Sequence, residues 1–174
     1  MPEAQIPVYG STDELILHLL QDFFDGQGIH IGTLFSEEIN PPMIIARAER
    51  RSGAIVQAVS DDRFLHTAIV SISTITSGVD ADEIGEELQE AIRVCLRQAQ
   101  MKQIVVPNGG HIATIANSSA PSRVSDFATS TGIVQYASLP SGWVRWESLW
   151  QLVLRHPPQS TITNRFLTIP DQSV

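Results

Sequence analysis

The chain has 174 residues, a formal net charge of −8 and an isoelectric point near 5.0, with 43% apolar and 17% charged residues. This length suits one domain with a sizeable core, whereas two complete domains would be cramped. The acidic charge argues against a protein that grips nucleic acid through its phosphates, because such proteins carry clustered lysine and arginine. Cys95 is the only cysteine, so the chain cannot form an internal disulfide.

No apolar run is long enough to span a membrane, and no basic region precedes an apolar stretch at the N-terminus. We therefore expect a soluble protein, made in the cytoplasm, with no membrane partner.

A first helix is predicted over about residues 11–25. Ser11 and Glu14 have the spacing of a capping box, in which the serine side chain accepts from the amide three residues on. Apolar residues then recur at helical spacing, and the glycines of the segment 25–28 end the helix. The pattern indicates an amphipathic helix packed on a sheet.

Candidate strands follow at 29–35, 43–49, 54–59 and 64–76. Asn40-Pro41-Pro42 separates the first two, because a residue before proline is forced into extended conformation. The fourth strand is apolar on both faces, which predicts a central strand covered on two sides.

The second helix, predicted over about residues 80–101, is expected to begin at Asp80 as its N-cap. Acidic residues fill its first half and basic residues its second half, a polarity that complements the helix dipole. Its buried stripe is expected to comprise Ile84, Leu88, Ala91, Ile92, Cys95, Leu96 and Ala99.

Short strands are expected at 104–106, 111–116 and 133–139, with turns at 107–110 and 140–142. The segment 117–131 is rich in Ser, Thr and Ala, lacks periodicity and is predicted to be a long loop.

Residues 143–155 alternate with period two, which predicts a long strand with one face on the core. They contain all three tryptophans of the chain. The core side would carry Val144, Trp146, Trp150, Leu152 and Leu154, interrupted only by Ser148. The other side would carry Trp143, Arg145, Glu147, Gln151 and Arg155, mixed with Leu149 and Val153.

Together these elements predict an α+β fold, a mostly antiparallel twisted sheet of about four to six strands packed by two helices. One domain is expected over residues 1–158. Residues 159–174 are either a disordered tail or an arm that lies on a neighbouring molecule.

Little in the sequence points to chemistry. The five histidines are spread over separate elements and show no zinc-ligand spacing, and no Gly-x-Ser-x-Gly motif occurs. Gly109-Gly110 leads into a strand rather than a helix, so a hairpin turn is favoured over a phosphate loop. We expect no catalytic, cofactor-binding or metal-ligating residues, although groups that meet only in space escape sequence reasoning.

The surface instead has features of protein contact, because Trp and Arg are common interface anchors. The hypothesised interface residues are Arg123, Trp143, Arg145, Glu147, Arg155, Phe166 and Leu167. The plain alternative is an α+β monomer with a long loop.

Four stretches of the chain, taken in order, form a recognisable pattern: Pro41-Pro42-Met43-Ile44-Ile45, Asp62-Arg63-Phe64 to Ser73, Ala81 to Leu96, and Trp143-Val144-Arg145-Trp146-Glu147 running to Leu154-Arg155-His156-Pro157. With the order of the predicted elements, this pattern resembles the tail terminator (tail completion) proteins of long-tailed bacteriophages, in particular those of actinobacteriophages. The resemblance covers most of residues 11–158 and is one of pattern and element order. The segments 117–131 and 159–174 have no counterpart in it.

The resemblance implies a structural virion protein, not an enzyme, that forms a ring of commonly six subunits at the tail–neck junction. Such a ring, assembled in the host cytoplasm, caps the head-proximal end of the tail tube, stops its polymerisation and joins the tail to the head. The implied partners are further copies of the chain, the major tail tube protein and a head-completion or connector protein. Genome DNA would pass the lumen without specific binding, and no cofactor is implied.

Two alternatives stay open. One is another neck or head-completion protein, to which the same surface arguments apply. The other is a small cytoplasmic enzyme or ligand-binding domain, with a pocket under loop 117–131.

Overall fold

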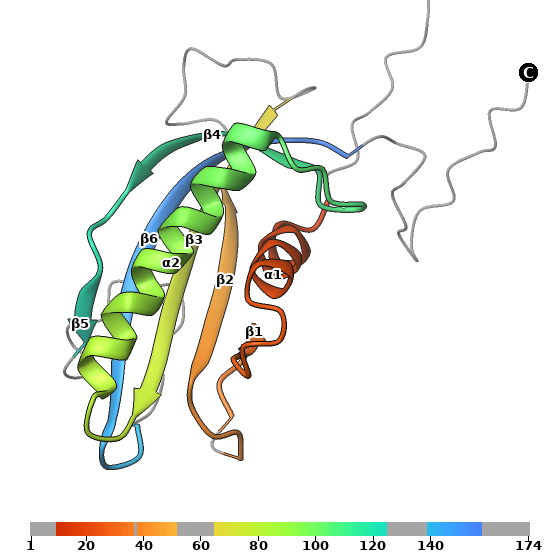
Figure 1. Ribbon diagram of the computed structural model, residues 1–174. Coiled ribbons are helices and arrows are strands. Elements are labelled where there is room, and N and C mark those ends of the chain that lie inside the picture. Colours follow the sequence, from red (N-terminus) through yellow and green to blue (C-terminus); the bar gives the residue numbers. More distant parts are fainter. Residues whose placement is uncertain (1–9, 37, 52–64, 125–138, 158–174) are drawn as a thin grey trace, which may run out of the picture.

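A computed structural model describes residues 10–36, 38–51, 65–124 and 139–157 (Figure 1). Within these ranges the chain forms two helices and one six-stranded sheet, which confirms the predicted α+β class. The elements are α1 (Thr12–Phe23), β1 (His30–Gly32), β2 (Met43–Arg51), β3 (Leu65–Ser77), α2 (Ala81–Lys102), β4 (His111–Ser118), β5 (Ser122–Val124) and β6 (Trp143–Arg155).

The sheet is built around β3 and β6, which pair antiparallel over 13 residues each, from Leu65 opposite Arg155 to Ser77 opposite Trp143. The order of strands is β1-β2-β3-β6-β4, and β5 also pairs with β6. Among the described strands only β1 and β2 run parallel. The expectation of a mostly antiparallel sheet is therefore confirmed.

β4 and β5 share one edge of β6. β4 pairs with the C-terminal half of β6 and β5 with residues 145–147 near its start. Between the two short strands Ser119 holds the chain in place, because its amide donates to the Leu149 carbonyl and its Oγ accepts from the Leu149 amide, each at 2.8 Å. The predicted loop 117–131 is therefore wrong for the residues in β4 and β5. Residues 125–131 lie outside the described part.

Other strand predictions need similar correction. Only residues 30–32 of the predicted strand 29–35 pair with a neighbour, since the chain turns away after Gly32. Ile104 and Val105 are in no strand; Val106 forms a single bridge with Gly110 that closes the hairpin turn. The predicted strand 54–59 and residues 133–138 of the last short strand lie outside the described residues.

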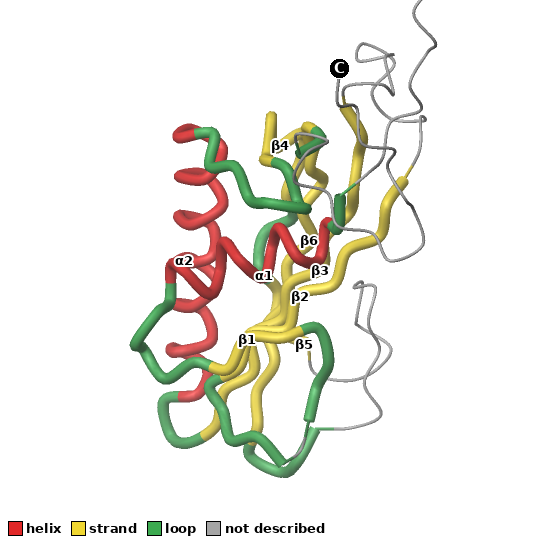
Figure 2. Tube along the Cα trace, turned by 90° about the vertical axis from the view of Figure 1, so that its right-hand side faces the viewer, coloured by secondary structure: helices red, strands yellow, loops and turns green. Residues whose placement is uncertain are grey.

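Both helices pack on the same face of the sheet (Figure 2). The predicted cap of α1 is confirmed, because Ser11 Oγ accepts from the Glu14 amide at 3.2 Å. Asp13, two residues later, accepts from the Ala48 amide at 2.7 Å and ties α1 to β2 beyond the end of β1. The core between helices and sheet includes Leu15, Leu20, Ile44, Ile72, Ile92, Leu96, Trp150 and Leu152, so the predicted inward side of the 143–155 strand is confirmed.

The buried stripe of α2 differs from the prediction at its N-terminal end. Ile84 is exposed, whereas Gly85 and Gln89 are buried. A Cβ on Gly85 would lie 2.5 Å from Cδ1 of Trp146, so glycine lets the helix approach this indole closely. Asp80 occupies the N-cap position, but its side chain makes no capping hydrogen bond. Near the same end of the helix, Thr76 of β3 donates to the Ala81 carbonyl and ties α2 to the sheet.

Gln89 joins α2 to the two central strands through a buried polar contact. Its Nε2 donates to the Ile72 carbonyl at 3.2 Å and to the Trp146 carbonyl at 3.3 Å. Its Oε1 accepts from Ser148 Oγ at 2.7 Å, and Ser148 Oγ in turn accepts from Trp150 Nε1 at 2.9 Å. Ser148, the one polar residue on the core side of β6, is therefore matched by the one amide on the buried side of α2.

Replacing Gln89 with Leu should destabilise the fold, because the Ser148 hydroxyl and two strand carbonyls would lose a buried partner. We expect a loss of about 2–3 kcal/mol in the free energy of unfolding, measured by urea denaturation. Gln98→Leu, the same change on the exposed side of α2, is the matched control and should have little effect. Equal stability of the two variants would contradict the role given to Gln89.

Candidate functional site

The sheet face opposite the helices carries a buried ion pair. Arg145 Nη2 lies 3.1 Å from Glu147 Oε2, and both side chains are almost fully buried. Arg145 also donates to Ser73 Oγ at 3.2 Å, and Ser71 Oγ donates to Glu147 Oε1 at 3.2 Å. In the register of the two strands Ser73 lies opposite Glu147, and both hydrogen bonds run diagonally to the next residue on the same face. The pair holds β3 and β6 together and is unsuited to be an exposed interface anchor.

The remaining hypothesised interface residues are scattered. Trp143 is half-buried and packs edge-to-face on Phe35, with ring centroids 6.0 Å apart. Arg123 in β5 is exposed and pairs with Asp82 of α2 at 3.0 Å, while Arg155 is exposed at the far end of β6. Phe166 and Leu167 lie outside the described residues. The five residues of this set that the structure describes therefore do not form one exposed surface.

Each end of α2 carries a small exposed surface that the sequence pattern did not indicate. Exposed apolar side chains gather at each end, although isolated apolar residues on a surface are ordinary. Val79 and Ile84 lie at the N-terminal end; Met101, Ile104 and Val105 lie at the C-terminal end, with Met101 83% and Val105 53% exposed. α2 has 22 residues and is about 33 Å long, and Ile84 and Met101 lie about 26 Å apart along it.

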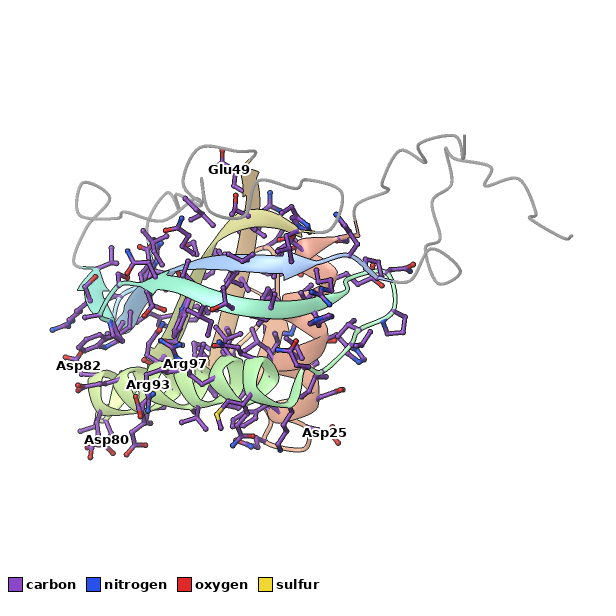
Figure 3. All side chains as sticks on the ribbon, turned by 90° about the horizontal axis from the view of Figure 1, so that it is seen from above. Asp25, Glu49, Asp80, Asp82, Arg93 and Arg97 are labelled. Atoms are coloured by element: carbon purple, nitrogen blue, oxygen red, sulfur yellow. The ribbon has the colours of Figure 1, made fainter. Side chains whose placement is uncertain are left out.

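The charged residues of α2 are also separated by sign along the helix axis. Asp80 and Asp82 lie at one end of α2, and Arg93 and Arg97 lie further along it (Figure 3). The acidic residues Asp82, Glu83, Glu86, Glu87 and Glu90 are all exposed, as are Arg93, Arg97 and Lys102. Glu90 and Arg93 pair at 2.6 Å; the hydrogen bond from Arg93 lowers the pKa of Glu90, and the same contact raises the pKa of Arg93. The exposed face of α2 therefore changes from acidic to basic along its length.

Two histidines meet where β3 begins and β6 ends. The rings of His66 and His156 stack with centroids 5.2 Å apart and planes 19° from parallel, although the sequence places them on separate elements. His111 opposes Arg155 across β4 and β6; burial, and then the charge of Arg155, lowers the pKa of His111 and favours its neutral form. In the described part of the chain, no three or more His, Cys, Asp or Glu side chains form a group that could hold a metal ion.

Cys95 lies in the core between the helices. Its Sγ donates to the Leu19 carbonyl at 3.5 Å. Burial, and to a lesser extent the charge of Asp22, raises the pKa of the thiol to about 12. The neutral thiol is therefore strongly favoured near neutral pH, as suits packing rather than nucleophilic chemistry.

Neither a scan against models of protein families nor a search of curated proteins finds a match to this chain. None of the helices in the described ranges is both long enough and apolar enough to cross a membrane.

Glu147→Gln should be strongly destabilising, because it removes the buried carboxylate that pairs with the buried Arg145 guanidinium. We expect a loss of about 3 kcal/mol by urea denaturation. Glu90→Gln breaks the exposed pair with Arg93 and serves as control, with no measurable change expected. Arg145→Leu/Glu147→Leu should recover much of the loss, since both members of the buried ion pair are then replaced by apolar side chains; a double variant as unstable as Glu147→Gln would argue against this explanation.

Cys95 should react very slowly with a chromogenic disulfide reagent at about pH 8. A pKa of about 12 instead of 9.0 lowers the thiolate fraction roughly a thousandfold. In concentrated urea the same thiol should react rapidly, and because the chain has one cysteine the signal comes from this site alone. A native rate within about tenfold of the unfolded rate would show that the thiol is accessible and ionised.

Proposed function

We propose that this chain is a structural protein of a bacteriophage tail, a tail terminator whose copies form a ring on the head-proximal end of the tail tube. The observation that carries the proposal is the presence of exposed apolar residues at two opposite ends of α2. A head-to-tail contact joins two different patches of neighbouring subunits, and such contacts close into rings when the rotation between subunits permits. The resemblance in element order to tail terminator proteins supports the same function.

The mechanism is a physical one. Tube subunits add through one repeating contact, so growth continues until something binds the last layer and presents a different face. A ring bound to the tube on one face would stop growth and present its other face to a head-completion or connector protein. The net charge of −8 suits a lumen through which DNA passes without binding, because like charges repel.

The proposal places the protein in the virion, at the tail–neck junction. It gives the chain no catalytic step and no cofactor. A different position in the neck would use the same subunit contacts, and binding to purified tail tubes distinguishes the two positions.

Native mass spectrometry of the purified chain over a wide range of concentrations tests ring formation. We expect one closed species with a fixed number of subunits, commonly six in proteins of the family that it resembles. A monomer at every concentration would contradict self-assembly of the ring and favour the small enzyme or ligand-binding domain.

The terminating activity is tested by adding the chain to growing tail tubes assembled from the tube protein of the same phage. Tubes should stop elongating, and electron microscopy should show a cap at one end only. Tubes of unchanged length, with a ring that forms but does not bind, would contradict the terminator function and leave another neck protein.

A further inference from the structure

The two ends of α2 differ in a way that specifies which surfaces of neighbouring copies would meet. We define the acidic end as Val79, Glu83, Ile84, Glu86 and Glu87, and the basic end as Arg97, Met101, Lys102, Ile104 and Val105. Every one of these side chains is exposed. Each end therefore combines apolar side chains with charges of one sign.

Interactions within the chain do not account for the acidic end. Glu83 and Glu87 are four residues apart, and Glu83 and Glu86 three apart, so their side chains are neighbours on the helix surface and repel. The helix dipole favours acids only near the first turn, whereas Glu86 and Glu87 lie beyond it.

Ion pairs within the chain do not neutralise the charges at the two ends of α2. The described part of α2 pairs Glu90 with Arg93, and Asp82 with Arg123 of β5. Within the described residues, Glu83, Glu86 and Glu87 make no ion pair, and neither do Arg97 and Lys102. The opposite charges lie too far apart along one rigid helix to meet in a single chain.

We propose that the acidic end of α2 in one copy binds the basic end of α2 in the next copy, an inference that rests on the proposed ring. The occupant of each surface is a second copy of this chain, because each end supplies the charge that the other lacks. Val79 and Ile84 would be covered by Met101, Ile104 and Val105, while the three glutamates would face Arg97 and Lys102. Such a contact is heterologous, so every subunit uses both ends once.

Charge reversal at each end tests the contact. The acid-reversed variant is Glu83→Lys/Glu86→Lys/Glu87→Lys, and the base-reversed variant is Arg97→Glu/Lys102→Glu. Each variant alone places like charges in the contact, so each should lose the assembled species in native mass spectrometry at low salt. A one-to-one mixture restores opposite charges at every contact, and it should assemble into a ring in which the two variants alternate.

A matched control carries three reversals elsewhere, Asp22→Lys/Asp25→Lys/Glu38→Lys, on exposed residues outside α2. It changes the net charge as much as the acid-reversed variant and should assemble like the wild type. Circular dichroism confirms the fold of each variant, and assembly of the mixture shows independently that both are folded.

The outcomes separate this inference from the proposed function. A wild-type chain that stays monomeric at every concentration overturns both. A wild type and variants that all form the same closed species overturn only the contact between the ends of α2. Single variants that fail while the mixture also fails, or a mixture that yields only two-chain species, overturn the end-to-end arrangement.

Discussion

The structure depends on the antiparallel pairing of β3 and β6. Every other described element attaches to one of these two strands or to its neighbour: β2 pairs with β3, β4 and β5 pair with β6, and α2 lies across both. Different kinds of contact stabilise the two faces of this pair of strands. Toward the helices, apolar packing is supplemented by the Gln89–Ser148 contact; on the opposite face, Arg145 and Glu147 pair beside Ser71 and Ser73. A buried polar contact is satisfied only in one register, because a shift of one residue moves each side chain to the other face. The two polar contacts therefore specify how the central strands align.

The paired strands β3 and β6 hold α2 against one face of the sheet. One side of α2 is committed to the core through Leu88, Ile92, Cys95 and Leu96, which leaves its other side and its ends exposed. The exposed side has two properties that packing on the sheet does not explain: neighbouring glutamates beyond the first turn, and apolar side chains at both ends. The proposed contact between neighbouring subunits would use both properties, because opposite charges and apolar side chains lie at its two ends. Proteins that act by assembly carry their function in such surfaces rather than in a constellation of reactive groups.

The proposed role in a phage tail combines two independent arguments. One is the resemblance in element order, which concerns the sequence as a whole; the other is the asymmetry of α2, which concerns one exposed surface. Four of the seven residues that the sequence pattern assigned to an interface make contacts within the chain. Arg145 and Glu147 are structural, Trp143 packs on Phe35, and Arg123 pairs with Asp82 close to the acidic end of α2.

The sequence by itself determined the two helices, the alternation of residues 143–155 and the α+β class, because periodicity and capping are local properties of the chain. It indicated that Arg145 and Glu147 lie on the side of β6 opposite to Trp150. It could not show that this side is also buried, because burial depends on what packs against a face and not on the alternation itself. Ser148 was visible as an exception, but its partner Gln89 lies 59 residues away in sequence, and the close approach of Gly85 to Trp146 is equally non-local. Only the tertiary structure decided that Gly85 and Gln89 rather than Ile84 face the sheet, and that β5 pairs with β6, since each depends on contacts between segments far apart in the chain.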